Sequence, residues 1–574
     1  MRKEFTSFTY LNITQFLGAL NDNIYKLLIV YFLLELNGIQ DSHIILGATG
    51  AVFVLPFLLF SAGSGTLADR YSKRNVIVMT KILELITMSF GLLPFAFGIG
   101  WAAYITLFMM ATQSAIFGPS KYGIIPEIVH EDKITKANGL MTSFTFLAII
   151  IGTFIASFIS DITDRNFVLG GLFCISISLI GLIASIGIEY TPPAGSQERF
   201  DIRFLKAILN TCRLAKNYPS LLSAMLGSAY FLFLGAYIQL NIIPFAVESL
   251  GLSDVQGGYL FLITAIGIGT GSILAGKLSG KKVELGIVPL SMIFISLGLF
   301  YLNYFSYSFL AILPAILILG VLGGLFEIPL DSYIQIISPN QSRGQIVAAT
   351  NFLSYFGVLV ASALIYAATA IFHLRASQGF VLLGFICALV AAVYIYEFFD
   401  YMTRFIAMVL SRIHFSMRFQ GRENVPDEPT IYICTHTAWN DILLMMGSQR
   451  RRMRFFIEQP QQHHRAWIER LYRMMRIINI PGIEPIQQNH YCLGKMKRLL
   501  NKGFSICLFV EGEKIENEIE KLCSSEDFRS ILGDVPVVPV FIERGEKNRK
   551  RPLTQRLLQK VRIPALVTFG KSSL

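Results

Sequence analysis

Charged residues are scarce in this chain of 574 residues. They make up 15% of the sequence, whereas hydrophobic residues make up 53%. A soluble protein of ordinary composition carries about 25% charged residues. The deficit excludes an ordinary soluble enzyme along the whole length and favours a membrane protein.

Several other signatures are missing. The seven cysteines show no Cys-x-x-Cys spacing, so we expect small buried side chains in a reducing compartment. His463-His464 lacks acids at metal-ligand spacing, and no glycine-rich nucleotide loop is present; we therefore predict no metal and no bound cofactor. No nucleic-acid recognition signature accompanies the basic residues, so nucleic acid is not an expected partner. The N-terminus has no cleavable signal peptide, and we expect it to be retained.

Long apolar segments recur twelve times, each of about 18–25 residues, which is enough to cross a bilayer. A polar stretch at 191–218 separates them into two groups of six. This pattern predicts two six-helix halves, 1–190 and 219–398, joined by a cytoplasmic linker. The spans are expected near 8–36, 43–64, 74–98, 100–119, 138–160, 166–189, 219–247, 256–277, 285–304, 307–330, 345–371 and 377–399.

The net charge of +11 belongs to the region after residue 400. That region holds 28 Lys and Arg against 17 Asp and Glu, and the first 400 residues hold 21 of each. Within the membrane part, positive residues gather in the connections after even-numbered spans, which places both termini in the cytoplasm. A basic tail there would be attracted to anionic lipid headgroups. The residues are Arg70, Lys73, Arg74, Arg199, Arg203, Lys206, Lys281 and Lys282.

One connection carries a recognisable signature. The run from Gly65 to Arg74, Gly-Thr-Leu-Ala-Asp-Arg-Tyr-Ser-Lys-Arg, resembles the segment between helices two and three of the major facilitator superfamily. Ser72 stands where the family usually has Gly. The resemblance implies an all-α membrane fold of twelve helices in two halves. It also implies a cytoplasmic gate formed by Gly65, Asp69, Arg70, Lys73 and Arg74, in which the acid and the base pair with helix ends.

Three further segments narrow the resemblance. The runs Gly18-Ala-Leu-Asn-Asp-Asn23, Gly118-Pro-Ser-Lys-Tyr-Gly123 and Lys136-Ala-Asn-Gly-Leu-Met141 resemble the bacterial lysophospholipid transporters. This implies a multi-pass protein of a bacterial inner membrane. Its expected substrate is a lysophospholipid, with lysophosphatidylethanolamine as the preferred candidate.

Charged residues inside the spans are candidates for the transport path, because charge at membrane depth is costly and tends to line a route. Asp22 and Lys26 lie four residues apart on one helix face, so they either neutralise each other or line the substrate route. Lys121 is expected to bind a phosphate or to pair with an acid. Asn23, Glu84, Glu327 and Asp331 complete the predicted path, and both glutamates are also candidates for a gate or coupling-ion site.

The tail is expected to begin with an interfacial helix at 399–420, where Val409, Leu410 and Ile413 share a side among basic residues. The alternative is an ordinary linker helix packed on its own domain. Region 421–574 then alternates apolar strands with basic helices, which predicts a cytoplasmic α/β domain with a mainly parallel sheet. Strands are expected at Thr430–Cys434, Arg454–Ile457, Ser505–Val510 and Val535–Phe541.

His436 and Asp441 follow the first of these strands. On one straight helix their side chains would diverge, so they can meet only if His436 lies in a turn and Asp441 in the first helical turn. With Phe509-Val-Glu511-Gly512 and Val535–Val540, they resemble the ordered blocks of the glycerolipid acyltransferases. The resemblance implies that His436 is the general base, that Asp441 orients it, and that Glu511 and Gly512 shape the acceptor pocket. The phosphate-binding Arg that usually ends the family's second block has no counterpart in Ile477 to Ile486, so either Lys514 or Arg476 is expected to bind the acceptor phosphate, or the preferred headgroup differs.

The combined prediction is a bifunctional lysophospholipid transporter, or flippase, and O-acyltransferase. The acyl donor would be acyl-carrier protein or acyl-CoA, supplied by a separate acyl-activating enzyme. Two alternatives remain open from the sequence. One is a membrane-anchored 1-acylglycerol-3-phosphate acyltransferase whose transporter is degenerate. The other is a transporter of another amphiphile with an inactive tail.

Overall fold

The computed structural model describes residues 2–38, 40, 42–198, 203–426, 428–435, 441–449, 451–458, 478–480, 490–510, 525–533, 535–544 and 563–571. The chain divides into two compact units, Met1–Glu397 and Phe398–Leu574.

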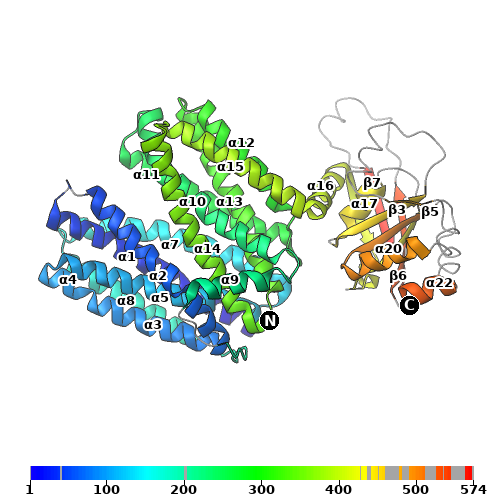
Figure 1. Ribbon diagram of the computed structural model, residues 1–574, viewed down its shortest axis with the longest axis horizontal. Coiled ribbons are helices and arrows are strands. Elements are labelled where there is room, and N and C mark those ends of the chain that lie inside the picture. Colours follow the sequence, from blue (N-terminus) through cyan, green and yellow to red (C-terminus); the bar gives the residue numbers. More distant parts are fainter. Residues whose placement is uncertain are drawn as a thin grey trace. The chain divides into compact units, whose positions relative to one another are not determined.

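In the residues that the structure describes, the regular elements of the first unit are all helices (Figure 1). Of its described residues, twelve helices have 18 or more residues, and eleven spans are also apolar enough to cross a membrane. The remaining long helix, α5, carries Gln113, Ser114 and Lys121 along its second half. The predicted all-α membrane fold is confirmed. The twelve are α1 Arg2–Asn37, α2 Ser42–Arg70, α3 Lys73–Phe90, α5 Gly100–Gly123, α7 Ile134–Ile162, α8 Phe167–Ile186, α10 Leu221–Leu250, α11 Asp254–Ser279, α12 Ile287–Tyr304, α13 Phe309–Ile337, α14 Arg343–Tyr366 and α15 Ala376–Glu397.

Several of these helices extend beyond the predicted apolar runs. Helix α13 continues to Ile337, so Asp331 lies inside it although the apolar run was expected to end near residue 330. The polar stretch between the halves contains a further helix, α9 Phe204–Ala215. Hydropathy alone missed the extension of α13, because a helix end that packs on neighbouring helices need not be apolar.

The described residues of the second unit contain a seven-stranded sheet in the order β1-β7-β6-β2-β5-β3-β4. All neighbouring strands are parallel except β6 and β7. The predicted α/β class and all four predicted strands are confirmed, with shifts at the ends; β1, β4 and β7 were not foreseen. The strands are β1 Phe415–Gln420, β2 Ile431–Thr435, β3 Met453–Glu458, β4 Ile478–Ile480, β5 Ser505–Val510, β6 Val537–Arg544 and β7 Ile563–Phe569.

Both faces of this sheet are covered. Along β2, Tyr432 and Cys434 join the core beneath α17 (Asp441–Ser448), whereas Ile431 and Ile433 join the opposite core. That second core is shared with α20 (His490–Asn501) and α22 (Glu526–Leu532) (Figure 1). Because successive side chains of a strand point to opposite faces, a central strand buried on both sides is apolar throughout.

The helix expected at 399–420 is shorter than predicted. Helix α16 spans Phe399–His414, and β1 follows without a break. One face of α16 packs on its own domain: Arg454 on β3 donates two hydrogen bonds to Asp400, of 2.8 and 2.7 Å, and a Cβ on Gly447 would overlap Ser411. The alternative of a helix packed on its own domain therefore holds for this face. Another face leaves Val409, Leu410 and Ile413 exposed.

Candidate functional site

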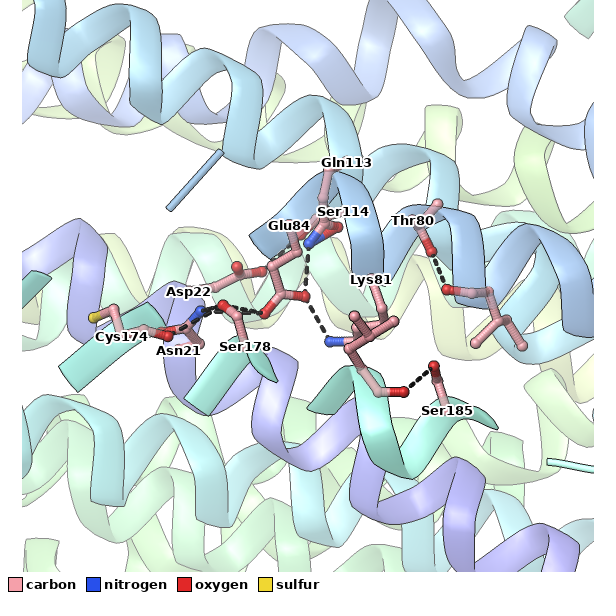
Figure 2. Close-up of polar contacts among 12 residues, drawn as sticks. Asn21, Asp22, Thr80, Lys81, Glu84, Gln113, Ser114, Cys174, Ser178 and Ser185 are labelled. Carbon is pink, nitrogen blue, oxygen red and sulfur yellow. Dashed lines mark hydrogen bonds and ion pairs between the residues drawn. The ribbon is translucent and has the colours of Figure 1, made fainter. Parts of the chain in front are cut away.

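A buried carboxylate, Glu84 on α3, ties four helices of the first unit together (Figure 2). It accepts hydrogen bonds from Lys81 at 2.6 Å, Gln113 at 3.0 Å, Asn21 at 3.1 Å and Ser178 at 3.4 Å. Its side chain is 1% exposed. In a low-dielectric interior a carboxylate is tolerable only when its oxygens are paired in this way. Both oxygens of Glu84 are therefore engaged with the protein.

Lys81 was missed by the sequence reasoning. Its ammonium lies in a slot left by two glycines, since a Cβ on Gly18 would come within 2.5 Å of Nζ and one on Gly181 within 3.8 Å. The side chain is 2% exposed and forms an ion pair with Glu84. The sequence did contain a signal that could have predicted this ion pair: Lys81 and Glu84 are opposite charges three residues apart within an apolar span. The slot itself depends on how α1 and α8 pack against α3.

Asp22 and Lys26 do not pair with each other. Asp22 Oδ2 accepts a hydrogen bond of 2.7 Å from Ser114, and its Oδ1 is buried with no partner among the described residues. The Lys26 ammonium instead lies 5.1 Å from the centre of the Phe53 ring. The two side chains form no direct ion pair but still act on each other electrostatically, so mutual neutralisation and a place on the substrate route both stay predictions. Neither side chain has an oppositely charged group within ion-pair distance among the described residues.

Lys121 near the end of α5 has aromatic neighbours. Its ammonium lies 4.5 Å from the centre of the Tyr122 ring and 5.7 Å from that of Phe117. Within the described residues it has no carboxylate at ion-pair distance. Asn23, in contrast, donates a hydrogen bond of 2.7 Å to the carbonyl of Ala19 on its own helix. Like Lys26, Lys121 has an aromatic ring beside its ammonium and, among the described residues, no carboxylate within ion-pair distance.

The other half holds two acids. Ser228 on α10 lies 2.7 Å from Glu327 Oε1 and 3.0 Å from Asp331 Oδ1. A single hydroxyl can donate only one hydrogen, so it cannot satisfy both carboxylates at once. Glu327 Oε2 is buried without a partner among the described residues. The structure therefore brings these two predicted residues together.

Asp69 joins the two halves. Its oxygens accept hydrogen bonds from the backbone N–H groups of Gly344 at 2.6 Å and Gln345 at 2.9 Å. These residues begin α14, so the carboxylate interacts with the positive end of that helix. Gly65 lies one turn earlier on α2, where a Cβ would come within 2.7 Å of the Gln345 Cα. The expected pairing of an acid with a helix end is present.

The rest of this signature holds the first half together. Lys73 is buried and forms an ion pair of 2.6 Å with Glu127, while Arg74 donates to the carbonyls of Ile186 and Ile188 near the end of α8. Arg70 is exposed. Ser72 caps α3 by accepting from the Asn75 N–H at 3.4 Å. A serine can therefore replace the usual glycine at this position, because it starts the following helix.

A second link between the halves is uncharged. Asn138 on α7 and Gln335 on α13 exchange two hydrogen bonds, each of 3.0 Å, and Asn138 also donates to Ser332 at 3.1 Å. All three side chains are buried. Asn138 lies in one of the segments singled out from the sequence. Its partner could not be identified there, since the two residues are 197 positions apart.

In the second unit, β2 and β5 end at register partners, Thr435 and Val510. His436 follows the first in the sequence, and Glu511, Gly512 and Lys514 follow the second; all four lie outside the described residues. Asp441 is described. It is buried and begins α17, as the spacing required. Among the described residues, no group of three or more His, Cys, Asp or Glu side chains could hold a metal ion.

Comparison with known families gives two matches. Residues 11–362 match the Major Facilitator Superfamily, and residues 416–543 match the Acyltransferase family. Among related proteins, a lysophospholipid transporter of Enterobacter sp. (strain 638) is 29% identical over 294 residues, covering 50% of this chain and 69% of the relative. One from Klebsiella pneumoniae subsp. pneumoniae is 27% identical over 329 residues, covering 56% and 78%.

Solved structures agree on the fold. The fucose:proton symporter of Escherichia coli aligns with a TM-score of 0.57 at 13% identity, covering 68% of this chain and 98% of its own. A human organic anion transporter aligns with a TM-score of 0.56 at 13% identity, covering 68% and 99%. At such low identity the likeness extends to the arrangement of helices alone.

Proposed function

Since this chain belongs to the Major Facilitator Superfamily and continues into an acyltransferase domain, we propose that it moves lysophospholipid across a bacterial inner membrane and re-acylates it. Lysophosphatidylethanolamine is the proposed principal substrate. The related proteins that match the transport domain are named lysophospholipid transporters. The acyltransferase domain acts on the cytoplasmic face, where both termini lie.

The observation that carries the transport proposal is the set of unpaired charges inside the first unit. Among the described residues, Asp22 has an oxygen without a hydrogen-bond partner, and Lys26 and Lys121 have aromatic neighbours but no carboxylate within ion-pair distance. Isolated charges at membrane depth are costly, so they are retained where a ligand or water-filled route compensates them. A lysophospholipid headgroup supplies a phosphate for the lysines and, in the ethanolamine lipid, an ammonium for the carboxylates.

Glu327 and Asp331 extend this path into the second half. Two carboxylates that share one hydroxyl form a region of negative potential, which favours a cation. The ethanolamine ammonium is the cation that the proposed substrate brings. Asn23 lies beside Asp22 on α1 and completes the path.

Asp69 serves as part of the gate. Its bonds to the first residues of α14 favour the conformation in which α2 and α14 are in contact. Gly65 permits the close approach, while Lys73 and Arg74 hold the gate's own half together. Opening toward the cytoplasm requires these bonds to break, and the exposed Arg70 interacts with lipid phosphates near the opening.

The acyltransferase step uses His436 as general base. It removes the proton from the free glycerol hydroxyl, and the oxygen attacks the carbonyl of an acyl thioester; the thiolate then leaves and takes up the proton. Asp441, buried at the start of α17, holds the imidazole in the required tautomer. Glu511, Gly512 and Lys514 bind the acceptor. The donor is acyl-carrier protein or acyl-CoA, charged by a separate acyl-activating enzyme.

Reconstitution into vesicles with labelled lysophosphatidylethanolamine tests both activities in one preparation. We expect the His436→Ala variant to retain uptake and to lose acylation by at least about a hundredfold, the scale of general-base catalysis. Uptake abolished together with acylation would contradict two separate activities. Acylation that persists in this variant would contradict the role of His436.

A further inference from the structure

Helix α9 (Phe204–Ala215) lies in the connection between two membrane-spanning helices, α8 and α10, and packs on α2 and α14 (Figure 1). Its buried residues, Ile208, Thr211 and Ala215, share one side of the helix. In its first turn, the centre of the Phe204 ring lies 6.2 Å from that of Phe352 on α14. Because α2 belongs to the first half and α14 to the second, α9 contacts both helices that meet at the gate.

The outer side of α9 mixes apolar and basic side chains. Leu205 and Leu209 are 56% and 58% exposed. Lys206, Arg213 and Lys216 are exposed as well. With 3.6 residues per turn, Lys216 projects on the same side as the two leucines, and Arg213 lies next to Leu209. No acidic residue occurs within α9, so the charge of this outer side is purely positive.

Such a mixture fits a membrane surface. Exposed lysines rule out the hydrocarbon core, where a charge is costly, whereas exposed leucines are poorly suited to water. At the surface, apolar side chains reach the acyl chains while basic ones meet the headgroups. The spans before and after α9 keep it within reach of that surface. Because the outer side carries only positive charge, it favours anionic headgroups.

A cavity lies between α9 and the gate. Its volume is about 1030 Å³, and its lining includes Leu214 on α9 and Gln345 on α14. The backbone N–H of Gln345 is one of the two donors to Asp69. The Gln345 side-chain nitrogen is buried with no hydrogen-bond partner among the described residues. The last turn of α9 is therefore not tightly packed on the start of α14, and α9 has room to shift beside the gate.

We propose that α9 binds the anionic lipid surface through Leu205, Leu209 and its basic residues, and that this contact holds α2 against α14. Lipid occupies the outer side alone, so the buried side stays on both gate helices. When α2 and α14 separate, α9 keeps only one of them and is less firmly held with its outer side toward the lipid. Bound lipid therefore favours the closed gate, since a ligand shifts an equilibrium toward the state that it binds better. This inference goes beyond the proposed function and holds whichever lipid is transported.

The test uses the full chain in vesicles of phosphatidylcholine, with or without phosphatidylglycerol. Among the described cysteines, Cys212 on α9 is the one that is not buried, so it reports on α9 in a Cys523→Ser background. We expect phosphatidylglycerol to slow the labelling of Cys212 by an uncharged maleimide about threefold to tenfold. Lys206→Gln with Lys216→Gln should remove most of that slowing.

Two exposed lysines at the end of α11 provide the matched control. Lys277→Gln with Lys281→Gln removes the same amount of positive charge away from α9, and the slowing should persist in this variant. Slowing of equal size in the α9 double variant would overturn the proposal, because the surface charge would then act on the labelling reaction and not through α9.

The gate is read by a second pair of reporters, Ala68→Cys and Ala348→Cys, in a chain whose other reactive cysteines are replaced by serine. Both alanines are buried where α2 and α14 meet: a Cβ on Gly344 would lie 2.8 Å from the Ala68 Cβ, and one on Gly65 would lie 2.7 Å from the Ala348 Cβ. They react only when the gate opens. We expect phosphatidylglycerol to slow their labelling, and the α9 double variant to lose this effect.

Labelling of Cys212 at the same rate in both kinds of vesicle would overturn the lipid contact. Gate cysteines that react equally fast in both would overturn the hold of α9 on the gate. Neither readout requires transport. Vesicles that take up no lysolipid would therefore contradict the proposed function and leave this inference standing.

Discussion

At the scale of single residues, the intramembrane charges divide into two kinds. Glu84 and Lys81 form a buried ion pair, whereas, among the described residues, Asp22, Lys26 and Lys121 lie beyond ion-pair distance of one another. All five look alike in the sequence, since each is one charge in an apolar span. Their different roles follow from neighbours that belong to other helices.

The Lys81–Glu84 pair gives a prediction about stability. Removing one partner leaves an uncompensated buried charge, whereas removing both leaves a neutral site. We expect Lys81→Met to lower the free energy of unfolding by about 3–5 kcal/mol. Adding Glu84→Gln should recover most of that loss, because the amide can still accept from Asn21. Thermal unfolding of the purified proteins in detergent measures this, and a double variant no more stable than the single one would contradict it.

At the scale of elements, the contact between α2 and α14 depends on glycine. A Cβ on Gly65 would lie 2.7 Å from the Gln345 Cα, where the backbone cannot yield easily. We therefore expect Gly65→Ala to prevent the close contact and to lower uptake by about tenfold or more, the effect of roughly 1–3 kcal/mol of overpacking.

Helix α2 supplies the control for this change. Nothing lies within 4 Å of a Cβ on Gly50, so Gly50→Ala should leave uptake nearly unchanged. Equal losses in both variants would mean that alanine is harmful to α2 in general and would contradict a specific role for the contact.

The two links between the halves are chemically different, which gives a second prediction at this scale. Asp69 uses charge, whereas Asn138 and Gln335 form a neutral pair. Either Asn138→Leu or Gln335→Leu alone leaves the other buried amide without its hydrogen-bond partner. Each single variant should lower the free energy of unfolding by about 1–3 kcal/mol. The double variant should lose less unfolding free energy than the two single variants lose together. Thermal unfolding across this cycle measures the coupling, and strict additivity would show that the pair does not act as a unit.

At the scale of the whole molecule, the fusion of transporter and acyltransferase gives a prediction about sidedness. Lysolipid added to the side opposite the acyltransferase domain must cross the membrane before it is acylated. Lys121→Gln should therefore slow acylation of lipid supplied on that side, at concentrations below KM. It should leave acylation of lipid supplied on the enzyme's own side unchanged. Equal slowing from both sides would contradict a transport defect.

Tethering explains why such a fusion is useful. If the proposed function holds, a domain linked to the transport domain by the short connection between α15 and α16 would receive the lysolipid at a high effective concentration. The exposed apolar residues of α16, Val409, Leu410 and Ile413, suit contact with the lipid surface. The opposite face of α16 packs on the acyltransferase domain.

The sequence by itself determined the class of each part. Spanning length and low charge predicted the membrane helices, and the alternation of apolar strands with basic helices predicted the α/β domain, because these patterns report local periodicity. Short signatures also predicted that Asp69 contacts a helix end and that Asp441 lies at the start of a helix. These features depend on neighbours along the chain.

The tertiary structure decided which charges are satisfied and which are not. Asp22 accepts a hydrogen bond from Ser114, on another helix. The Lys81 ammonium lies beside Gly18 and Gly181, which are distant in the sequence. Asn138 donates a hydrogen bond to Gln335 in the other half. The end of α16 at His414 and the strand after it were likewise set by the pairing of β1 with β7. Such partners are remote in the sequence, and only packing brings them together.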